Sequence, residues 1–91
     1  MENTLRKTTL AFLAERYPAA YKVEAITQRV NRSGLLDAYA DQPSVMAELR
    51  LLASRFKHVE LLVDDDGDQH WTATPEGVRA WQLDGGVSVG G

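Results

Sequence analysis

The feature that most constrains the fold is an acidic turn between two segments in which apolar residues alternate. Residues 59–63 read VELLV, the turn DDDGD follows, and residues 71–73 read WTA. A period of two is typical of β-strands, and an Asp-Gly pair is a strong signal for a tight turn between them. The sequence therefore predicts a two-stranded antiparallel hairpin.

Two registers are available to this hairpin, and they bury different side chains. A two-residue turn would put Trp71 on the face opposite the valines. The alternative is a three-residue loop with Gly67 in the left-handed conformation. It gives the pairs Leu61–Trp71 and Val59–Ala73, and we expect it because it provides one consistent apolar face.

Apolar residues at helical spacing predict four helices, at about residues 4–16, 24–33, 43–57 and 75–83. Asn3 or Thr4 is placed to cap the first of them, and Thr74 is placed to cap the last. The third helix carries its core residues within one narrow stripe. They are Val45, Leu49, Leu52 and Phe56.

The segments between these elements carry shorter signals. Residues 21–23 favour a short edge strand. In the loop at 35–42, we expect Leu35, Leu36 and Tyr39 to pack against the core.

The chain is expected to form one domain, because its 91 residues contain no internal repeat. Its composition is 44% hydrophobic and 25% charged, as in ordinary globular domains. From Gly85 onward the sequence is glycine-rich and has few groups to pack, so we predict a domain at 1–84 and a flexible tail at 85–91. The N-terminal apolar run is interrupted by charge too soon for a signal peptide. We expect a cytoplasmic protein that has no membrane partner.

The charge is divided unevenly along the chain. Residues 1–57 contain nine basic and six acidic side chains, a net +3, whereas residues 58–91 contain one basic and seven acidic side chains, a net -6. Any surface that binds a polyanion is therefore expected in the N-terminal two thirds.

The predicted elements follow the order helix, short strand, helix, helix, hairpin, helix. Two motifs add detail: SVMAELRLLASR in the third helix, and WTATPEG at the exit from the hairpin. Together they resemble the winged helix-turn-helix superfamily, in which a recognition helix precedes a wing hairpin. The resemblance covers about residues 4–83. It implies an α+β fold with a three-helix core, a two-stranded wing hairpin and a short C-terminal helix.

By this resemblance, the chain would be a small bacterial or phage transcriptional regulator that binds double-stranded DNA. With the core stripe facing inward, the third helix would offer its opposite face to the major groove, through Ser44, Ala47, Arg50 and Ser54. The candidates for phosphate contacts are Arg29, Arg32, Arg55 and Lys57. The alternative is that this face is simply solvated. A symmetric operator would favour a homodimer formed through the first or last helix, and a monomer or a subunit completed by another protein is equally compatible.

Two features depart from a DNA-binding winged helix. The loop at 35–42 is longer than a tight helix-turn-helix turn, and the tip of the hairpin is acidic where DNA-binding relatives commonly place Lys or Arg. Aspartates at that position repel phosphate. The alternative function is therefore a winged-helix protein–protein interaction module that does not bind DNA. Its surface would comprise Leu51, Asp64, Asp65, Asp66 and Asp68.

The sequence does not indicate a metal site or an enzyme. The hairpin aspartates have the spacing of the first three EF-hand ligands, but Gln69 stands where that loop needs glycine and Pro75 where it needs glutamate. Ser54 and His58 lie one helical turn apart, as a nucleophile and a base would, yet no third group is placed to orient them. We expect no catalytic activity, no cofactor, no metal and no small-molecule site.

Overall fold

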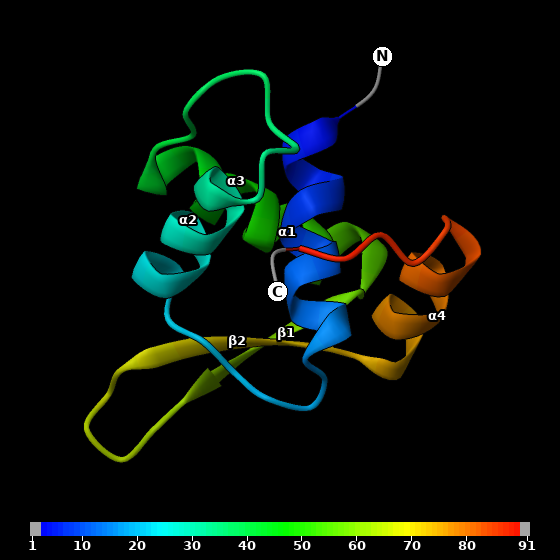
Figure 1. Cartoon of the computed structure of the whole chain (residues 1–91). Helices are drawn as coiled ribbons and strands as arrows, with labels where there is room; N and C mark the ends of the chain where they lie inside the picture. Colours follow the sequence, from blue (N-terminus) through cyan, green and yellow to red (C-terminus); the bar gives the residue numbers. More distant parts are fainter. Residues whose placement is uncertain (1–2, 90–91) are drawn as a thin grey trace.

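The computed structural model describes residues 3–89 of the chain (Figure 1). Four α-helices, a π-helical turn η1 and two strands follow one another: α1 Thr4–Glu15, α2 Val23–Arg32, α3 Gln42–Leu51, η1 Leu52–Phe56, β1 Val59–Val63, β2 Gln69–Ala73 and α4 Pro75–Leu83. The strands form one antiparallel hairpin. The fold is α+β, which confirms the predicted class.

The first helix, α1, lies at the centre of the molecule, with α2, α3 and α4 arranged around it (Figure 1). Every residue from Thr8 to Ala14 is buried, and Phe12 and Leu13 are completely inaccessible. A helix that is covered on several sides is buried around most of its circumference rather than along one stripe. The core is therefore built around the second half of α1.

A side-chain clamp fixes the loop that joins α2 to α3. The amide group of Asn31 donates a hydrogen bond to the carbonyl oxygen of Ala40 and accepts one from its backbone N–H, both at 2.8 Å. Ala40 is buried, whereas Tyr39 is 80% exposed and Leu35 is also exposed. The prediction that Leu35 and Tyr39 pack against the core is therefore wrong, and of the three expected residues only Leu36 packs there.

The third helix ends differently from the prediction. Val45, Leu49 and Leu52 are buried as expected, but Phe56 is 37% exposed. The wider π turn at Leu52–Phe56 changes the angle between successive side chains, so the stripe read at 100° per residue no longer applies. A left-handed Lys57, with φ of 59°, then ends the helical segment.

The hairpin has the predicted register, with Val59 opposite Ala73 and Leu61 opposite Trp71. Gly67 has a φ of +85°, as the three-residue loop requires. The apolar face is buried only at its base, because the hairpin projects beyond the helices (Figure 1). The expectation of one consistently buried apolar face is thus wrong for Leu61 and Val63.

The predicted edge strand at 21–23 is reduced to one residue. Tyr21 pairs with Trp71 through two backbone hydrogen bonds, of 2.9 and 2.8 Å, and α2 begins two residues later. Because Tyr21 lies on the side of β2 away from β1, it covers the outer edge of β2.

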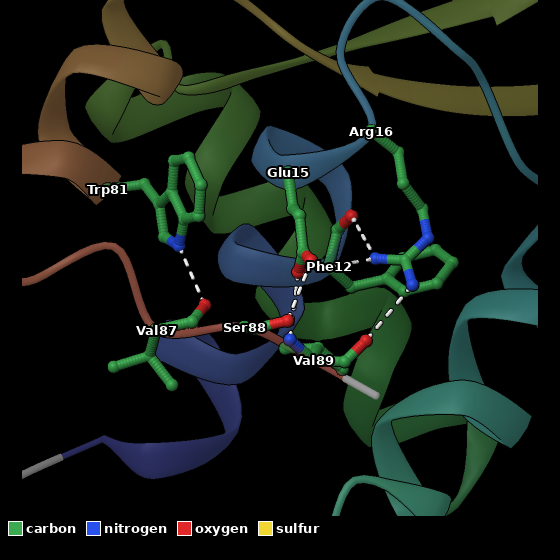
Figure 2. Close-up of polar contacts among 7 residues, drawn as sticks. All are labelled: Phe12, Glu15, Arg16, Trp81, Val87, Ser88 and Val89. Carbon is green, nitrogen blue, oxygen red and sulfur yellow. Dashed lines mark hydrogen bonds and ion pairs between the residues drawn. The ribbon is translucent and has the colours of Figure 1, made fainter. Parts of the chain in front are cut away.

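The prediction of an unpacked C-terminal tail is wrong for residues 85–89. Figure 2 shows this segment running beside the end of α1, where the carboxylate of Glu15 accepts hydrogen bonds from the Ser88 hydroxyl at 2.7 Å and from the Val89 backbone N–H at 2.9 Å. The carbonyl oxygen of Val89 accepts a third from Arg16, at 3.0 Å. Val89 itself is 1% exposed. Backbone groups and one valine thus supply the packing that the glycine-rich composition did not indicate; residues 90–91 lie outside the described part of the chain.

The last helix begins close against the end of η1. Thr74 caps α4 as predicted, since its hydroxyl oxygen accepts the Gly77 N–H at 3.0 Å. The same hydroxyl donates to the carbonyl oxygen of Lys57 at 2.7 Å, and the Thr74 N–H donates to that of His58 at 3.0 Å. These bonds tie the start of α4 to the chain segment that precedes β1. Trp81, further along α4, is partly buried against the core.

Candidate nucleic-acid interface

The outward face of α3 and η1 carries small side chains around one arginine. Ala47, Arg50 and Ser54 are all exposed, and Leu51 beside them is half-buried. The Ser54 hydroxyl donates to the carbonyl oxygen of Arg50 at 2.8 Å, which leaves the hydroxyl oxygen free to accept a hydrogen bond. The structure therefore brings three of the predicted groove-facing residues together on one accessible surface.

The only acidic side chain within α3 is turned away from that surface. Glu48 accepts hydrogen bonds from Nε of Arg6 at 2.8 Å and from Nδ2 of Asn3 at 3.3 Å, and its side chain is only 17% exposed. This ion pair joins α3 to the start of α1 and neutralises the carboxylate. Consequently Arg50 faces outward without an acidic neighbour from its own helix.

The N-terminus of α3 is already occupied by a carboxylate. Asp41 accepts the backbone N–H of Ser44 at 2.9 Å, and hydrogen bonds from the hydroxyl and the backbone amide of Ser44 hold the pKa of Asp41 below its usual value. Ser44 is exposed, but both of its donors are directed at Asp41. A phosphate would thus meet a negative charge at this end of the helix, and the middle and end of α3 are the accessible part for a polyanion.

The four cations predicted to contact phosphates are not equivalent. Arg32, Arg55 and Lys57 are exposed. Arg29 is half-buried, and its guanidinium lies 5.7 Å from the centre of the Phe12 ring on α1. Arg29 is therefore less accessible to a phosphate than the other three cations.

The tip of the hairpin is acidic and exposed. Asp64, Asp66 and Asp68 place carboxylate oxygens within 4.8 Å of one another, and Oδ1 of Asp64 accepts the backbone N–H groups of Asp66 and Asp68 at 2.9 Å each. Two basic side chains lie nearby: Nζ of Lys22 is 3.5 Å from Asp68, and Nδ1 of His70 is 3.8 Å from Asp64. This arrangement stabilises the turn, and its net negative charge opposes contact with a phosphate backbone.

The ion pair between α1 and α3 and the contacts of the C-terminal segment were not visible in the sequence. Arg6 and Glu48 are far apart in the chain, and so are Glu15 and Val89. No local periodicity links such residues, so only the packing of α1 against α3 and of the C-terminal segment against α1 brings them together. The available signal for Glu48 was its spacing, three residues after Val45 and four before Leu52, which puts it at the margin of the core stripe.

Two small hollows of about 210 Å³ each lie between α1 and α4, and both are lined by Lys7, Trp81 and Asp84. They are smaller than the roughly 300 Å³ at which pockets for organic ligands usually begin. Among the helices of residues 3–89, none has both the length and the apolar composition needed to cross a membrane. Comparison of the chain with protein-family models, with curated proteins and with solved structures found no match.

Proposed function

We propose that this chain is a winged helix-turn-helix DNA-binding protein that acts as a bacterial or phage transcriptional regulator. In this proposal α3 is the recognition helix, α2 packs behind it, and the β1–β2 hairpin is the wing. The order and packing of the described elements are compatible with that assignment. The observation that carries the proposal is the outward face of α3, where Arg50 is exposed among small residues while Glu48 is paired inward with Arg6.

The chemistry of this face fits the major groove. A guanidinium can donate two hydrogen bonds to O6 and N7 of guanine, which is the role we assign to Arg50. Ala47 leaves room for α3 to approach the base edges, and its methyl group can contact that of thymine. Ser54 supplies a hydroxyl oxygen at the same surface. The proposed reading surface is therefore short and centred on Arg50.

Phosphate contacts are assigned to Arg32, Arg55 and Lys57, the three exposed cations of the predicted set. The hairpin is not assigned any, because duplex DNA carries a negative charge about every 1.7 Å and would be repelled by the exposed aspartates. Three phosphate contacts predict a slope of about -2.7 in a plot of log affinity against log salt concentration. Affinity should then fall about 40-fold between about 50 and about 200 mM salt.

Fluorescence anisotropy of a labelled mixed-sequence duplex tests this proposal. The wild-type protein should bind with the salt dependence given above, and the double variant Arg50→Ala, Arg32→Ala should lose measurable binding. Arg79→Ala is the matched control, since it removes an exposed arginine from α4, outside the proposed surface. Absence of wild-type binding at the lower salt concentration, or equal losses in the double variant and the control, would refute the assignment.

A second function, binding of a basic protein partner, is favoured by one observation. Asp65 and Asp66 are exposed at the hairpin tip and form no ion pair within residues 3–89. Reversing the charges of Asp64, Asp65 and Asp66 would weaken such a partner, whereas it should leave DNA binding unchanged or tighten it. Opposite effects on the two ligands therefore separate the two functions.

A further inference from the structure

The outer strand of the hairpin exposes three consecutive apolar side chains. Leu61, Leu62 and Val63 are 39%, 41% and 59% exposed. On the other side of the hairpin, β2 is covered by Tyr21, so β1 is the open edge of the sheet. An exposed apolar edge strand is a template for pairing with another strand, and folded proteins usually cover it or interrupt it. We therefore expect the edge of β1 either to pair with another strand or to be protected from such pairing.

The backbone of this edge is also available for pairing. The N–H and C=O of Trp71 both bond to Tyr21, so they point away from β1. Leu61 is opposite Trp71, and in an antiparallel ladder the backbone groups of such a pair point away from each other. By the same alternation, Val59, Leu61 and Val63 direct their backbone N–H and C=O groups to the open edge.

We propose that the open edge of β1 pairs with β1 of a second copy of this chain. The two strands run antiparallel about a twofold axis at Leu61, and the hairpins then form one four-stranded sheet. Leu61 faces Leu61 of the partner subunit, and Val59 faces Val63 of the partner subunit. Each of these residues directs its backbone groups to the open edge, so all of the pairs are hydrogen-bonded.

The charges at the two ends of β1 favour this register over its neighbours. It places Lys57 near Asp65 of the partner subunit. Centring the pairing on Leu62 instead would set Glu60 against Asp64 of the partner subunit, and centring it on Glu60 would set that residue against its own copy. Of these three registers, the Leu61 register is the one without like charges directly opposite each other.

The same charges indicate why the occupant is a second copy. Lys57 and Asp65 are exposed and lie two residues beyond the two ends of β1, and neither forms an ion pair within residues 3–89. About a twofold axis, Lys57 of each subunit lies near Asp65 of the other subunit. The interface therefore contains this pair twice, which makes the edge self-complementary. This surface differs from the first or last helix that the sequence suggested for a homodimer, and the proposal does not depend on DNA binding.

The predicted dimer is weak, because one pair of short strands buries less than the roughly 1,200 Å² of a standard interface. Sedimentation velocity over about 10 µM to about 1 mM therefore suits its measurement, since small interfaces form transient complexes. Wild-type protein should change from monomer to dimer within this range. A sedimentation coefficient that stays at the monomer value throughout would overturn the proposal.

A charge swap tests the register. Lys57→Glu and Asp65→Lys should each raise the dimer dissociation constant about tenfold, because each change affects two symmetry-related pairs. The double variant Lys57→Glu, Asp65→Lys should restore the wild-type value. Arg79→Glu, which makes the same charge change as Lys57→Glu at a distant exposed site, is the control. If the single variants dimerise as the control does, this interface is refuted even if the protein dimerises. Circular dichroism confirms that each variant is folded.

Amide hydrogen exchange gives an independent readout on the wild-type chain. The N–H groups of Leu61 and Val63 should exchange rapidly in dilute solution and become protected as the concentration rises, since they gain partners only in the dimer. The N–H of Leu62, which points to β2, should be protected at both concentrations. Dimerisation without added protection at Leu61 and Val63 would place the interface elsewhere.

Discussion

Replacing Gly77 with alanine should destabilise the protein, although alanine is the better helix former. Gly77 is buried in the first turn of α4, where that helix meets the end of η1. A Cβ atom at this position would overlap the carbonyl oxygen of His58 and lie 2.9 Å from its carbonyl carbon. Both of these are backbone atoms, so no rotation of a side chain relieves the overlap.

The size of the effect follows from opposing contributions. Helix propensity alone would make Gly77→Ala about 1 kcal/mol more stable. Forcing an additional carbon into a packed site costs about 1–3 kcal/mol. Moving α4 away also weakens the bonds from Thr74 to the carbonyl oxygens of Lys57 and His58, each worth about 1 kcal/mol. The net loss is about 1–3 kcal/mol, and for a domain of this size the melting temperature should fall by about 5–20 °C.

Thermal unfolding followed by circular dichroism measures this change. Gln82→Ala is the control, because Gln82 is exposed on the same helix and its replacement should shift stability by no more than about 0.5 kcal/mol. A rise in the melting temperature of Gly77→Ala would mean that helix propensity dominates. That result would refute the close approach of α4 to His58 and remove the physical reason for glycine in the Thr-Pro-Glu-Gly motif.

Three further predictions concern other contacts. Hydrogen bonds from Ser88, which is the largest cause, and from Val89 lower the pKa of Glu15. Their contribution to holding the C-terminal segment is therefore fully present above the usual pKa of glutamate and is lost as the pH falls through the lowered pKa. The amide chemical shift of Val89 should titrate in that pH range, and a shift that does not change with pH would contradict this prediction. Thr74→Ala should lose about 1 kcal/mol in urea denaturation through the missing cap, and no loss would argue against that cap. Asn31→Ala should lose about 1–3 kcal/mol in the same assay, since it leaves both backbone groups of Ala40 unpaired, whereas a change below about 0.5 kcal/mol would mean that the clamp is unimportant.

The sequence correctly predicted those elements whose position is determined by neighbouring residues. The hairpin register follows from the alternation around Gly67, whose positive φ suits the loop that gives that register. The start of α4 follows from Thr74 and the proline after it, which provide a cap and a fixed φ where a helix begins. In both cases the deciding residues lie within a few positions of the element that they determine.

The predictions from the sequence were wrong where the helical period changed or where residues far apart in the chain contact each other. The exposure of Phe56 results from the π turn, which a constant helical period cannot anticipate. The C-terminal segment packs through Val89 and through backbone groups that composition does not report. The inward pairing of Glu48 with Arg6, which shapes the candidate interface, depends on how α1 packs against α3.

The most direct test of the proposed function is to map backbone amide shifts by NMR while a mixed-sequence duplex is added. We predict that shifts concentrate at Ala47, Arg50 and Ser54 on the outward face of α3 and η1, with smaller changes at Arg32, and that the hairpin tip at 64–68 is unaffected. Shifts centred on the hairpin tip, or no shifts at low salt, would contradict DNA recognition by α3.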